Sequence, residues 1–258
     1  MVPDVWVQLQ SHVLQLEREG LVTRTFRRLD PERQEAILNA ILDEAAEVGP
    51  ASINIKRVAE RADVSVGALY TYFPDRDAML SFIIALTVRI TVDGLNQARP
   101  QWVSLPLREA LLAYLRDGVL GGPLQAGLTR LYVRGAYQGD PDLLERLVQP
   151  IAELRRAVVR DMVMTAAGRG ELRPHVDIEG VAQVLYTLTS AIGDGQLLPY
   201  LSAYFQVTEE EMPVERLVAA MLDLVERGVA PAVEAKQDAR TQVRPAKKSA
   251  WQRRLIGI

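Results

Sequence analysis

The 258-residue chain contains no cysteine and only two histidines, His12 and His175. The absence of cysteine excludes disulfides, thiolate zinc sites and a cysteine nucleophile. The two histidines stand far apart in the sequence, so each is interpreted as a surface or packing residue rather than a ligand or general base. The glycines at 121 and 122 are followed by proline and no lysine, which indicates a helix break and not a phosphate loop. The sequence therefore favours neither an enzyme nor a bound cofactor.

Long hydrophobic runs and a strong net charge are missing as well. No uninterrupted apolar run approaches the ~20 residues that span a bilayer. The first residues, MVPDVWVQLQ, lack the basic region of a secretory signal. We therefore expect a cytoplasmic protein that makes no membrane contact. The net charge of −3 gives no whole-protein argument for nucleic acid, so such an argument has to rest on local charge.

Helical patterning is what the sequence has throughout. Asp30, Pro31 and Glu32 predict a helix start, because Asp caps free amide groups and Pro suits the first helical position. An apolar stripe follows and ends at Gly49. Further helices are predicted at 4–18, 75–98, 104–118, 123–138, 141–168, 177–204 and 213–229, with Pro150 expected to kink or split 141–168. With no convincing strand, the predicted fold class is all-α.

The stretch 54–80 has the most unusual pattern. It predicts a short helix, a tight turn, a second short helix and the start of a longer third, with Asn54, Ser65 and Asp75 placed to cap them. The second short helix, 65–73, carries no charge, unlike a helix on a solvated surface. It also carries hydroxyl groups that a core helix would not bury. This combination is typical of a helix that enters a groove of DNA.

Residues 31–80 resemble the N-terminal DNA-binding region of TetR-family transcriptional repressors. The resemblance rests on Gly49, on NIKRVA at 54–59, on ADVSVGALYTYF at 62–73 and on DRDAM at 75–79. It implies an N-terminal three-helix helix-turn-helix DNA-binding domain and a C-terminal helical domain for ligand binding and dimerisation. It also implies that the outward side of 65–73 enters the major groove and that a homodimer reads two half-sites of a double-stranded operator.

Three positions depart from the family pattern. Asn54 replaces the usual Thr and can still cap a helix. Asp63 replaces the usual turn Gly, and Asp tolerates a left-handed backbone better than most residues. Arg76 replaces the usual Lys and keeps the positive charge. None of these changes forbids the fold, although Asp63 puts a negative charge near the phosphate side.

The expected domain organisation has four segments. They are an N-terminal extension at 1–29, a helix-turn-helix domain at 30–76, a helical effector-binding and dimerisation domain at 77–230 and a basic tail at 231–258. The basic part of the extension, LVTRTFRRL, is either a solvated lead-in or an arm that lies along phosphates or in a minor groove. The tail is either a disordered solvated segment or a source of additional DNA affinity or docking.

The predicted DNA-binding residues are Lys56, Arg57, Ser65, Val66, Gly67, Ala68, Tyr70, Thr71, Tyr72 and Arg76, with Arg27 and Arg28 from the basic segment. Small and hydroxyl-bearing residues on 65–71 are expected at base edges. Lys56, Tyr70, Tyr72 and Arg76 are expected mainly at phosphates. Partial core packing remains the alternative for the two tyrosines, and a plain surface position remains the alternative for Arg57.

The C-terminal helices carry no family motif, so their residues are predicted from character alone. The candidate effector-binding residues are large or amphipathic: Trp102, Tyr114, Tyr132, Tyr137, Met162 and Tyr186. The candidate dimer-interface residues lie on the last two long helices: Val181, Val184, Leu185, Leu188, Leu217, Met221 and Leu224. Core packing within one subunit is the alternative for both sets.

The predicted function is that of a ligand-responsive repressor. Because inward-facing charge looks scarce in the C-terminal helices, the expected effector is a small, mainly apolar molecule. Its binding is expected to move the helix at 75–98, change the spacing of the two reading helices and release the operator. The alternative is a transcription factor that uses a protein partner or acts as an activator, without a small-molecule effector.

Overall fold

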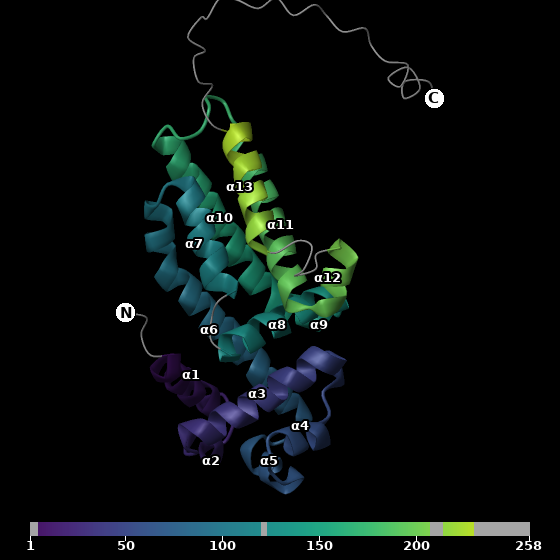
Figure 1. Ribbon diagram of the computed structural model, residues 1–258. Helices are drawn as coiled ribbons and strands as arrows, with labels where there is room; N and C mark the ends of the chain where they lie inside the picture. Colours follow the sequence, from purple (N-terminus) through teal and green to yellow (C-terminus); the bar gives the residue numbers. More distant parts are fainter. Residues whose placement is uncertain (1–4, 120–122, 207–213, 230–258) are drawn as a thin grey trace, which may run out of the picture.

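The computed structural model describes residues 5–119, 123–206 and 214–229, and every regular element within these ranges is a helix. This confirms the all-α prediction. The helices form two groups that are stacked end to end, with the N-terminal group below the C-terminal group in Figure 1. Helix α6 (Arg76–Ser104) runs from the first group into the second. The predicted tail at 231–258 lies outside the described residues.

The N-terminal group is made of short helices and one longer one. Its elements before α6 are α1 (Val5–Arg18), α2 (Arg24–Arg27), α3 (Pro31–Val48), the 3-10 turn η1 (Pro50–Ser52), α4 (Ile55–Arg61) and α5 (Val66–Tyr72). The predicted start of α3 is confirmed, because a carboxylate oxygen of Asp30 accepts a hydrogen bond from the Arg33 amide at 2.9 Å. Helix α3 ends at Gly49, whose φ of 89° suits a residue without Cβ.

The C-terminal group contains longer helices. They are α7 (Leu107–Val119), α8 (Pro123–Gln138), α9 (Pro141–Leu143), the π-helical turn η2 (Leu144–Val148), α10 (Gln149–Gly168), α11 (Ile178–Leu197), α12 (Pro199–Phe205) and α13 (Val214–Val229). Pro150 follows the π-helical turn, which accommodates its missing amide proton without a break. The predicted helix at 177–204 is divided, because Pro199 ends α11 and begins α12.

Two hydrophobic cores lie along the molecule. The first is formed by α1 to α6 together with parts of α8, α9, η2, α10 and α12, and it includes Phe26, Ile41 and Phe82. The second is formed by α7, α10, α11 and α13 and by the end of α6, and it includes Trp102 and Met162. Helix α6 contributes side chains to both cores and so links their packing.

The composition of α6 reflects this double role. By length and composition alone α6 could cross a membrane, although the sequence shows no uninterrupted apolar run. In the fold this helix packs against α1, α7, α8 and α10. Its residues Met79, Phe82, Ile83 and Ile90 are buried by these neighbours. Packing inside the protein therefore accounts for part of its apolar character.

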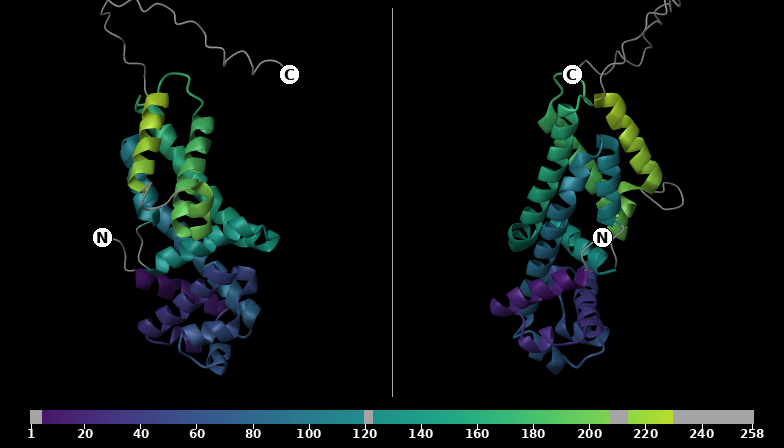
Figure 2. Two further views of the ribbon diagram at one scale, coloured as in Figure 1. Left: turned by 45° about the vertical axis from the view of Figure 1, so that its right-hand side comes forward. Right: turned by 90° about the vertical axis from the view of Figure 1, so that its left-hand side faces the viewer.

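The N-terminal extension packs onto α5 and α6. In α1, Leu9, Val13 and Leu16 are fully buried, and the helix packs against α6. Figure 2 shows α1 in purple at the upper edge of the N-terminal group in both views. Polar contacts reinforce this packing, since His12 Nε2 lies 3.1 Å from Asp93 Oδ2 on α6. The helix at 4–18 that the sequence predicted is thus a structural part of the lower group.

The second part of the extension contacts α5. Thr23 uses both of its donors at the end of α5: its amide bonds to the Tyr72 carbonyl at 2.9 Å, and its hydroxyl donates to the Thr71 carbonyl at 2.7 Å. Three residues later, the Phe26 ring packs against the rings of Tyr72 and Phe73, with centroid separations of 6.1 and 5.5 Å. The extension therefore connects the C-terminal end of α5 to α6.

Candidate nucleic-acid interface

The helix-turn-helix unit is built by local capping. The Asn54 side chain accepts from the Lys56 amide at 2.9 Å, and the Ser65 hydroxyl accepts from the Ala68 amide at 3.0 Å. Asp75 caps α6 in the same way, accepting from the Ala78 amide at 2.7 Å. Between α4 and α5, Asp63 adopts a left-handed backbone with φ of 50°. The predictions for all three caps and for this turn residue are confirmed.

A surface pocket of about 450 Å³ lies beside α5. It is lined by Ser52, Ile53, Asn54, Ile55, Lys56, Val66, Tyr70 and Arg76. The pocket therefore lies where the start of α4 meets the first turns of α5 and α6. It brings together three of the residues predicted at phosphates, Lys56, Tyr70 and Arg76. A backbone phosphate seated here would meet an ammonium group and a phenol close to the N-terminus of α4.

Helix α5 presents a small, uncharged outer face. Ser65, Gly67, Tyr70 and Thr71 are exposed, and Tyr70 is 52% exposed. A Cβ added at Gly67 would meet only the Ser65 hydroxyl, at 3.8 Å, so the backbone at this position is open to close approach. These features fit a helix that lies in a major groove with its backbone near the base edges.

Other predicted residues of α5 face partly or wholly inward. Val66 and Ala68 are partly buried and pack on the first core, while Leu69 and Phe73 are buried as the sequence predicted. Tyr72 is only 9% exposed, and its ring lies edge-on to Phe26. Of the two tyrosines, the structure thus places Tyr70 on the surface and Tyr72 in the core.

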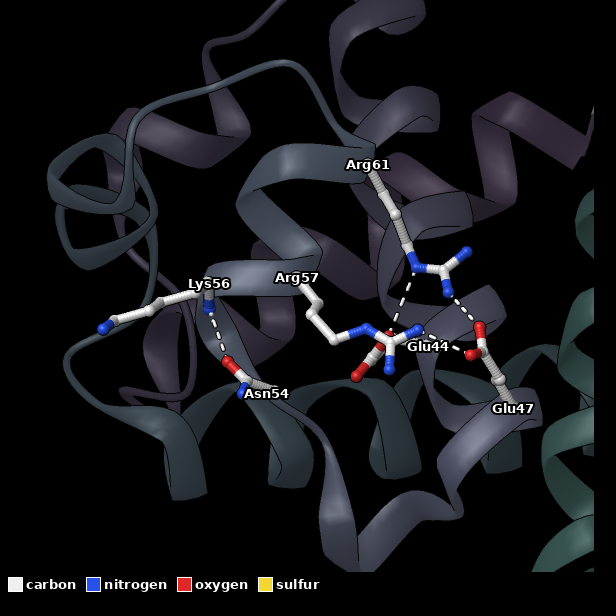
Figure 3. A network of polar contacts seen from close by, with 6 residues as sticks. All are labelled: Glu44, Glu47, Asn54, Lys56, Arg57 and Arg61. Atoms are coloured by element: carbon white, nitrogen blue, oxygen red, sulfur yellow. Dashed lines mark hydrogen bonds and ion pairs between the residues drawn. The ribbon is translucent and has the colours of Figure 1, made fainter.

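Arg57 belongs to a network of ion pairs between α3 and α4, which Figure 3 shows from close by. Its guanidinium lies 3.1 Å from the buried carboxylate of Glu44 and 2.6 Å from Glu47. Arg61 contacts the same two acids. Hydrogen bonds from Arg57 and Arg61 hold the pKa of Glu47 below its usual range. The side chain of Lys56 extends away from this network, which leaves Lys56 as the outward cation at the start of α4.

Arg76 is held by the backbone of the preceding turn. Its Nε donates to the Ile53 carbonyl at 2.9 Å, and an Nη group donates to the Ala51 carbonyl. The other Nη lies 3.1 Å from Asp77. These bonds fasten the start of α6 to η1 and thereby shape the pocket wall, while the guanidinium stays partly exposed. Sequence reasoning missed this bracing role, because the carbonyl partners lie more than 20 residues away.

The basic segment of the extension forms α2 and not an extended arm. Arg27 pairs with Glu17 of α1, whereas Arg24 and Arg28 are exposed. Neighbouring Phe26 is fully buried, which fixes the helix to the first core. The exposed arginines therefore project from an anchored helix next to α5.

The C-terminal group contains a small polar cavity of about 20 Å³. It is lined by Tyr114, Leu115, Thr129, Arg155, Thr189, Gly193, Asp194 and Leu197. Arg155 Nε donates to the Tyr114 hydroxyl at 2.9 Å, and the guanidinium lies over the Tyr114 and Tyr132 rings at 5.8 and 5.6 Å. Burial raises the pKa of Asp194, which the nearby Arg155 and the Tyr137 hydroxyl act to lower.

This polar cavity differs from the expectation that inward-facing charge is scarce. Arg155 lies four residues after Ile151 and four before Val159, and both of these are fully buried. That register is the sequence signal that could have identified Arg155 as inward-facing. Asp194 is the only charged residue in the last four turns of α11, which is a comparable signal.

Predicted effector residues surround this cavity to different degrees. Tyr114 lines it, and the ring of Tyr132 lies under Arg155. Tyr137 is largely exposed, but its hydroxyl donates to Asp194 Oδ2 at 3.2 Å. Trp102 and Met162 are buried in the second core, against which the partly buried Tyr186 packs. The structure thus brings three of the six predicted residues to one polar centre.

The predicted interface residues divide between surface and core. Val184, Leu188 and Leu224 are 57%, 41% and 74% exposed, which is unusual for large apolar side chains. Leu185 and Met221 are buried in the core of the same subunit, and Val181 and Leu217 are partly buried. Helices α11 and α13 contact each other, so their exposed apolar residues belong to adjoining surfaces.

Two stretches of the chain match known protein families. Residues 37–81 match the family described as bacterial regulatory proteins, tetR family. Residues 106–191 match the tetracyclin repressor-like C-terminal domain. The first stretch contains the helix-turn-helix unit, and the second contains the helices around the polar cavity.

Curated relatives are transcriptional regulators. YdeS of Bacillus subtilis, an uncharacterized HTH-type transcriptional regulator, is 26% identical over 162 residues, or 62% of this chain and 77% of YdeS. The HTH-type transcriptional repressor KstR of Rhodococcus jostii is 44% identical over 141 residues, or 55% of this chain and 65% of KstR. The stretch of this chain that matches KstR thus spans just under two thirds of the length of KstR.

Solved structures share the fold. A TetR family transcriptional regulator from Chloroflexus aurantiacus has a TM-score of 0.56 and 21% identity, covering 82% of this chain and 99% of that chain. FadR from Bacillus subtilis, solved in complex with stearoyl-CoA, has a TM-score of 0.53 and 16% identity, covering 75% and 98%. The DNA-binding and C-terminal matches, the regulators among the relatives and this shared fold agree. The chain belongs to the TetR family of bacterial transcriptional regulators.

Proposed function

We propose that the protein is a homodimeric repressor that binds a double-stranded operator through α5 and leaves it when a small molecule binds among the C-terminal helices. One observation carries the proposal: the uncharged outer face of α5 adjoins a surface pocket that contains Lys56 and Tyr70. The face suits base edges and the pocket suits a phosphate. The repressor KstR among the relatives supports the direction of regulation.

Division of labour at the interface follows from the side chains. Helix α5 carries no arginine, so it lacks the bidentate contact to guanine, and direct readout is limited to hydroxyl and methyl contacts from residues such as Ser65 and Thr71. Lys56 and Tyr70 contact the DNA backbone, and Arg24 and Arg28 are exposed on α2, which packs against α5. Arg57 stabilises the α3–α4 pair through Glu44 and Glu47 and has a smaller share in DNA binding. Sequence-dependent DNA shape supplies the remaining specificity.

The dimer interface is proposed on α11 and α13. Val184, Leu188 and Leu224 give each subunit an exposed apolar surface, and two copies of this helix pair would bury it in a four-helix arrangement. Such an interface would set the separation of the two copies of α5 and hence the half-site spacing.

Release is proposed to follow from a population shift. A molecule that enters between α7, α8, α10 and α11 separates these helices, and α10 packs extensively on α6. Helix α6 carries the movement to the first core and changes the spacing of the two α5 helices. The complex of FadR with stearoyl-CoA shows that a protein of this fold takes an apolar chain with a polar end. The proposed effector is likewise a small, mainly apolar molecule.

The first experiment selects operator DNA from a random duplex pool with the full 258-residue chain. Binding to the enriched duplex is then measured against salt concentration for the wild type, for Tyr70→Phe and for Lys56→Ala. Loss of the Lys56 phosphate contact should weaken binding to all sequences similarly and reduce the salt slope by about 1. Arg227→Ala, an exposed arginine at the far end of α13, is the matched control. Failure to enrich any duplex, or equal binding by Lys56→Ala, would refute the assignment.

A protein-partner mechanism is the second candidate. The observation in its favour is the aromatic surface of α12, where Tyr200, Tyr204 and Phe205 are all exposed and Arg134 lies 5.2 Å over the Tyr200 ring. Exposed aromatic side chains beside arginine are enriched at protein interfaces. If operator release requires a protein and no small molecule, Tyr204→Ala should abolish it without changing operator affinity.

A further inference from the structure

The polar cavity of the C-terminal group has an unusual set of hydrogen-bonding groups. Its volume of about 20 Å³ leaves room for roughly one water molecule. The Thr129 hydroxyl donates to the Gln125 carbonyl at 2.9 Å, and the Thr189 hydroxyl donates to the Leu185 carbonyl at 2.7 Å. Both threonine protons are therefore committed to their own helices, which leaves only their oxygen lone pairs for the cavity.

Donors that remain available come from two residues. The Tyr114 oxygen accepts from Arg155 Nε, so its own O–H proton is left to donate elsewhere. The two Nη groups of Arg155 make no hydrogen bond with any residue in the described ranges 5–119, 123–206 and 214–229. Both guanidinium Nη groups and one phenol O–H are thus available as donors at one end of the cavity.

Charge at this end is compensated only in part. Arg155 forms no ion pair within the described part of the chain. The aromatic rings of Tyr114 and Tyr132, over which its guanidinium lies, give only cation–π attraction. Asp194 lines the same cavity, accepts a hydrogen bond from the Tyr137 hydroxyl at 3.2 Å and is close enough to compensate the guanidinium charge in part. A partly buried guanidinium that lacks an ion pair still raises the free energy of the fold. A negatively charged ligand would offset this cost.

We propose that this cavity is the head-group site for an amphipathic carboxylic acid, whose carboxylate binds the Arg155 Nη groups and the Tyr114 hydroxyl. The proposal rests on the proposed function and names the chemical class of its effector. Two parallel N–H donors match the two oxygens of a carboxylate, and the phenol supplies a third hydrogen bond. A phosphate would bring more negative charge near Asp194 than a carboxylate does. An alcohol would leave the guanidinium without an anion.

Apolar side chains next to the cavity suit the apolar part of the acid. Leu115 and Leu197 line the cavity, and Tyr114 leads from it to Trp102 in the second core, with ring centroids 5.4 Å apart. Gly193 contributes no side chain, and a Cβ built there would have no neighbour within 4 Å, so α11 can be approached closely at this point. Because the cavity holds only about one water, the acid has to part α11 from α10, which packs on α6.

Matched acid and alcohol pairs test the class of ligand. Dodecanoate, 4-phenylbutyrate and 1-naphthylacetate are each compared with the corresponding alcohol by calorimetry and thermal shift on the full chain without DNA. At least one acid should bind about 10- to 100-fold more tightly than its alcohol, as expected for charge-assisted hydrogen bonds. If no acid binds, or if alcohols bind as tightly, the proposal is wrong.

Variants then assign the site. Arg155→Met should remove the preference for the acid, whereas Arg156→Met, which changes the exposed neighbouring arginine, should retain it. Tyr114→Phe deletes one hydrogen-bond donor and preserves the ring contacts. It should weaken acid binding several-fold while alcohol binding stays constant. If Arg155→Met does not fold, Tyr114→Phe alone tests the assignment of the site. Undiminished acid binding by Tyr114→Phe and Arg155→Met would overturn the site. Acid binding that depends on Arg155 in a protein without operator binding would refute the proposed function and leave this inference standing.

Discussion

Phe26→Ala should strongly destabilise the DNA-binding group. Phe26 is fully buried, although it lies in the N-terminal extension ahead of the helix-turn-helix unit. Its ring contacts Tyr72 and Phe73 at the end of α5 and Phe82 on α6, with centroid separations of 6.1, 5.5 and 5.5 Å. The Phe26 side chain therefore joins α5 to α6, the helix that connects the two groups.

The magnitude follows from complete burial. Truncation of a buried Phe to Ala costs about 3–5 kcal/mol, which combines lost transfer free energy with the cavity that remains. A domain of this size has a stability of about 5–15 kcal/mol, so the loss is a substantial fraction. With a urea m-value of about 2 kcal/mol/M, the midpoint of unfolding should fall by roughly 2 M. Operator affinity should fall as well, because α5 loses the support of its C-terminal end.

Urea unfolding followed by far-ultraviolet circular dichroism measures the first effect, and a gel shift with the selected duplex measures the second. Leu14→Ala on the more exposed side of α1 is the control and should change stability by less than about 0.5 kcal/mol. A Phe26→Ala protein within 1 kcal/mol of the wild type, or one with unchanged operator affinity, would refute the claim that the extension supports α5.

Two further predictions concern the C-terminal helices. Leu188→Glu places a charge on the exposed apolar surface of α11, so the dimer that we propose should dissociate to monomers in sedimentation analysis, whereas the same change at exposed Gln183 should leave it intact. Asp194→Asn should alter the pH dependence of stability: because burial raises the pKa of Asp194, the native state binds the proton more tightly than the unfolded chain, and stability falls as pH rises between the two pKa values. The amide removes that slope, and a thermal-shift profile across acidic pH that kept the wild-type slope would contradict the assignment.

The sequence by itself determined the helices and their ends. Asp30, Asn54, Ser65 and Asp75 cap the helices as predicted, because a cap needs only a side-chain oxygen and an amide two or three residues away. The left-handed turn at Asp63 is equally local. Short-range chemistry of this kind leaves a direct record in the order of residues, and so does the family pattern that surrounds it.

Partners between distant segments were decided by the tertiary structure. The sequence marks Arg57 as a cation near DNA, but only the packing of α4 on α3 brings it to Glu44 and Glu47. It treats the region around Thr23 and Phe26 as a lead-in or an arm, and only the fold shows these residues holding the end of α5.

The same limit applies to the polar cavity. Helical periodicity places Arg155 on an inward register but does not identify what it meets, because its environment comes from three other helices that are distant in sequence. Whether a buried charge is paired or left open to a ligand depends on separations of a few ångströms, since hydrogen bonds and ion pairs are short-ranged inside a protein. Those separations are fixed by how α7, α8, α10 and α11 pack together, and periodicity in one helix carries no information about them.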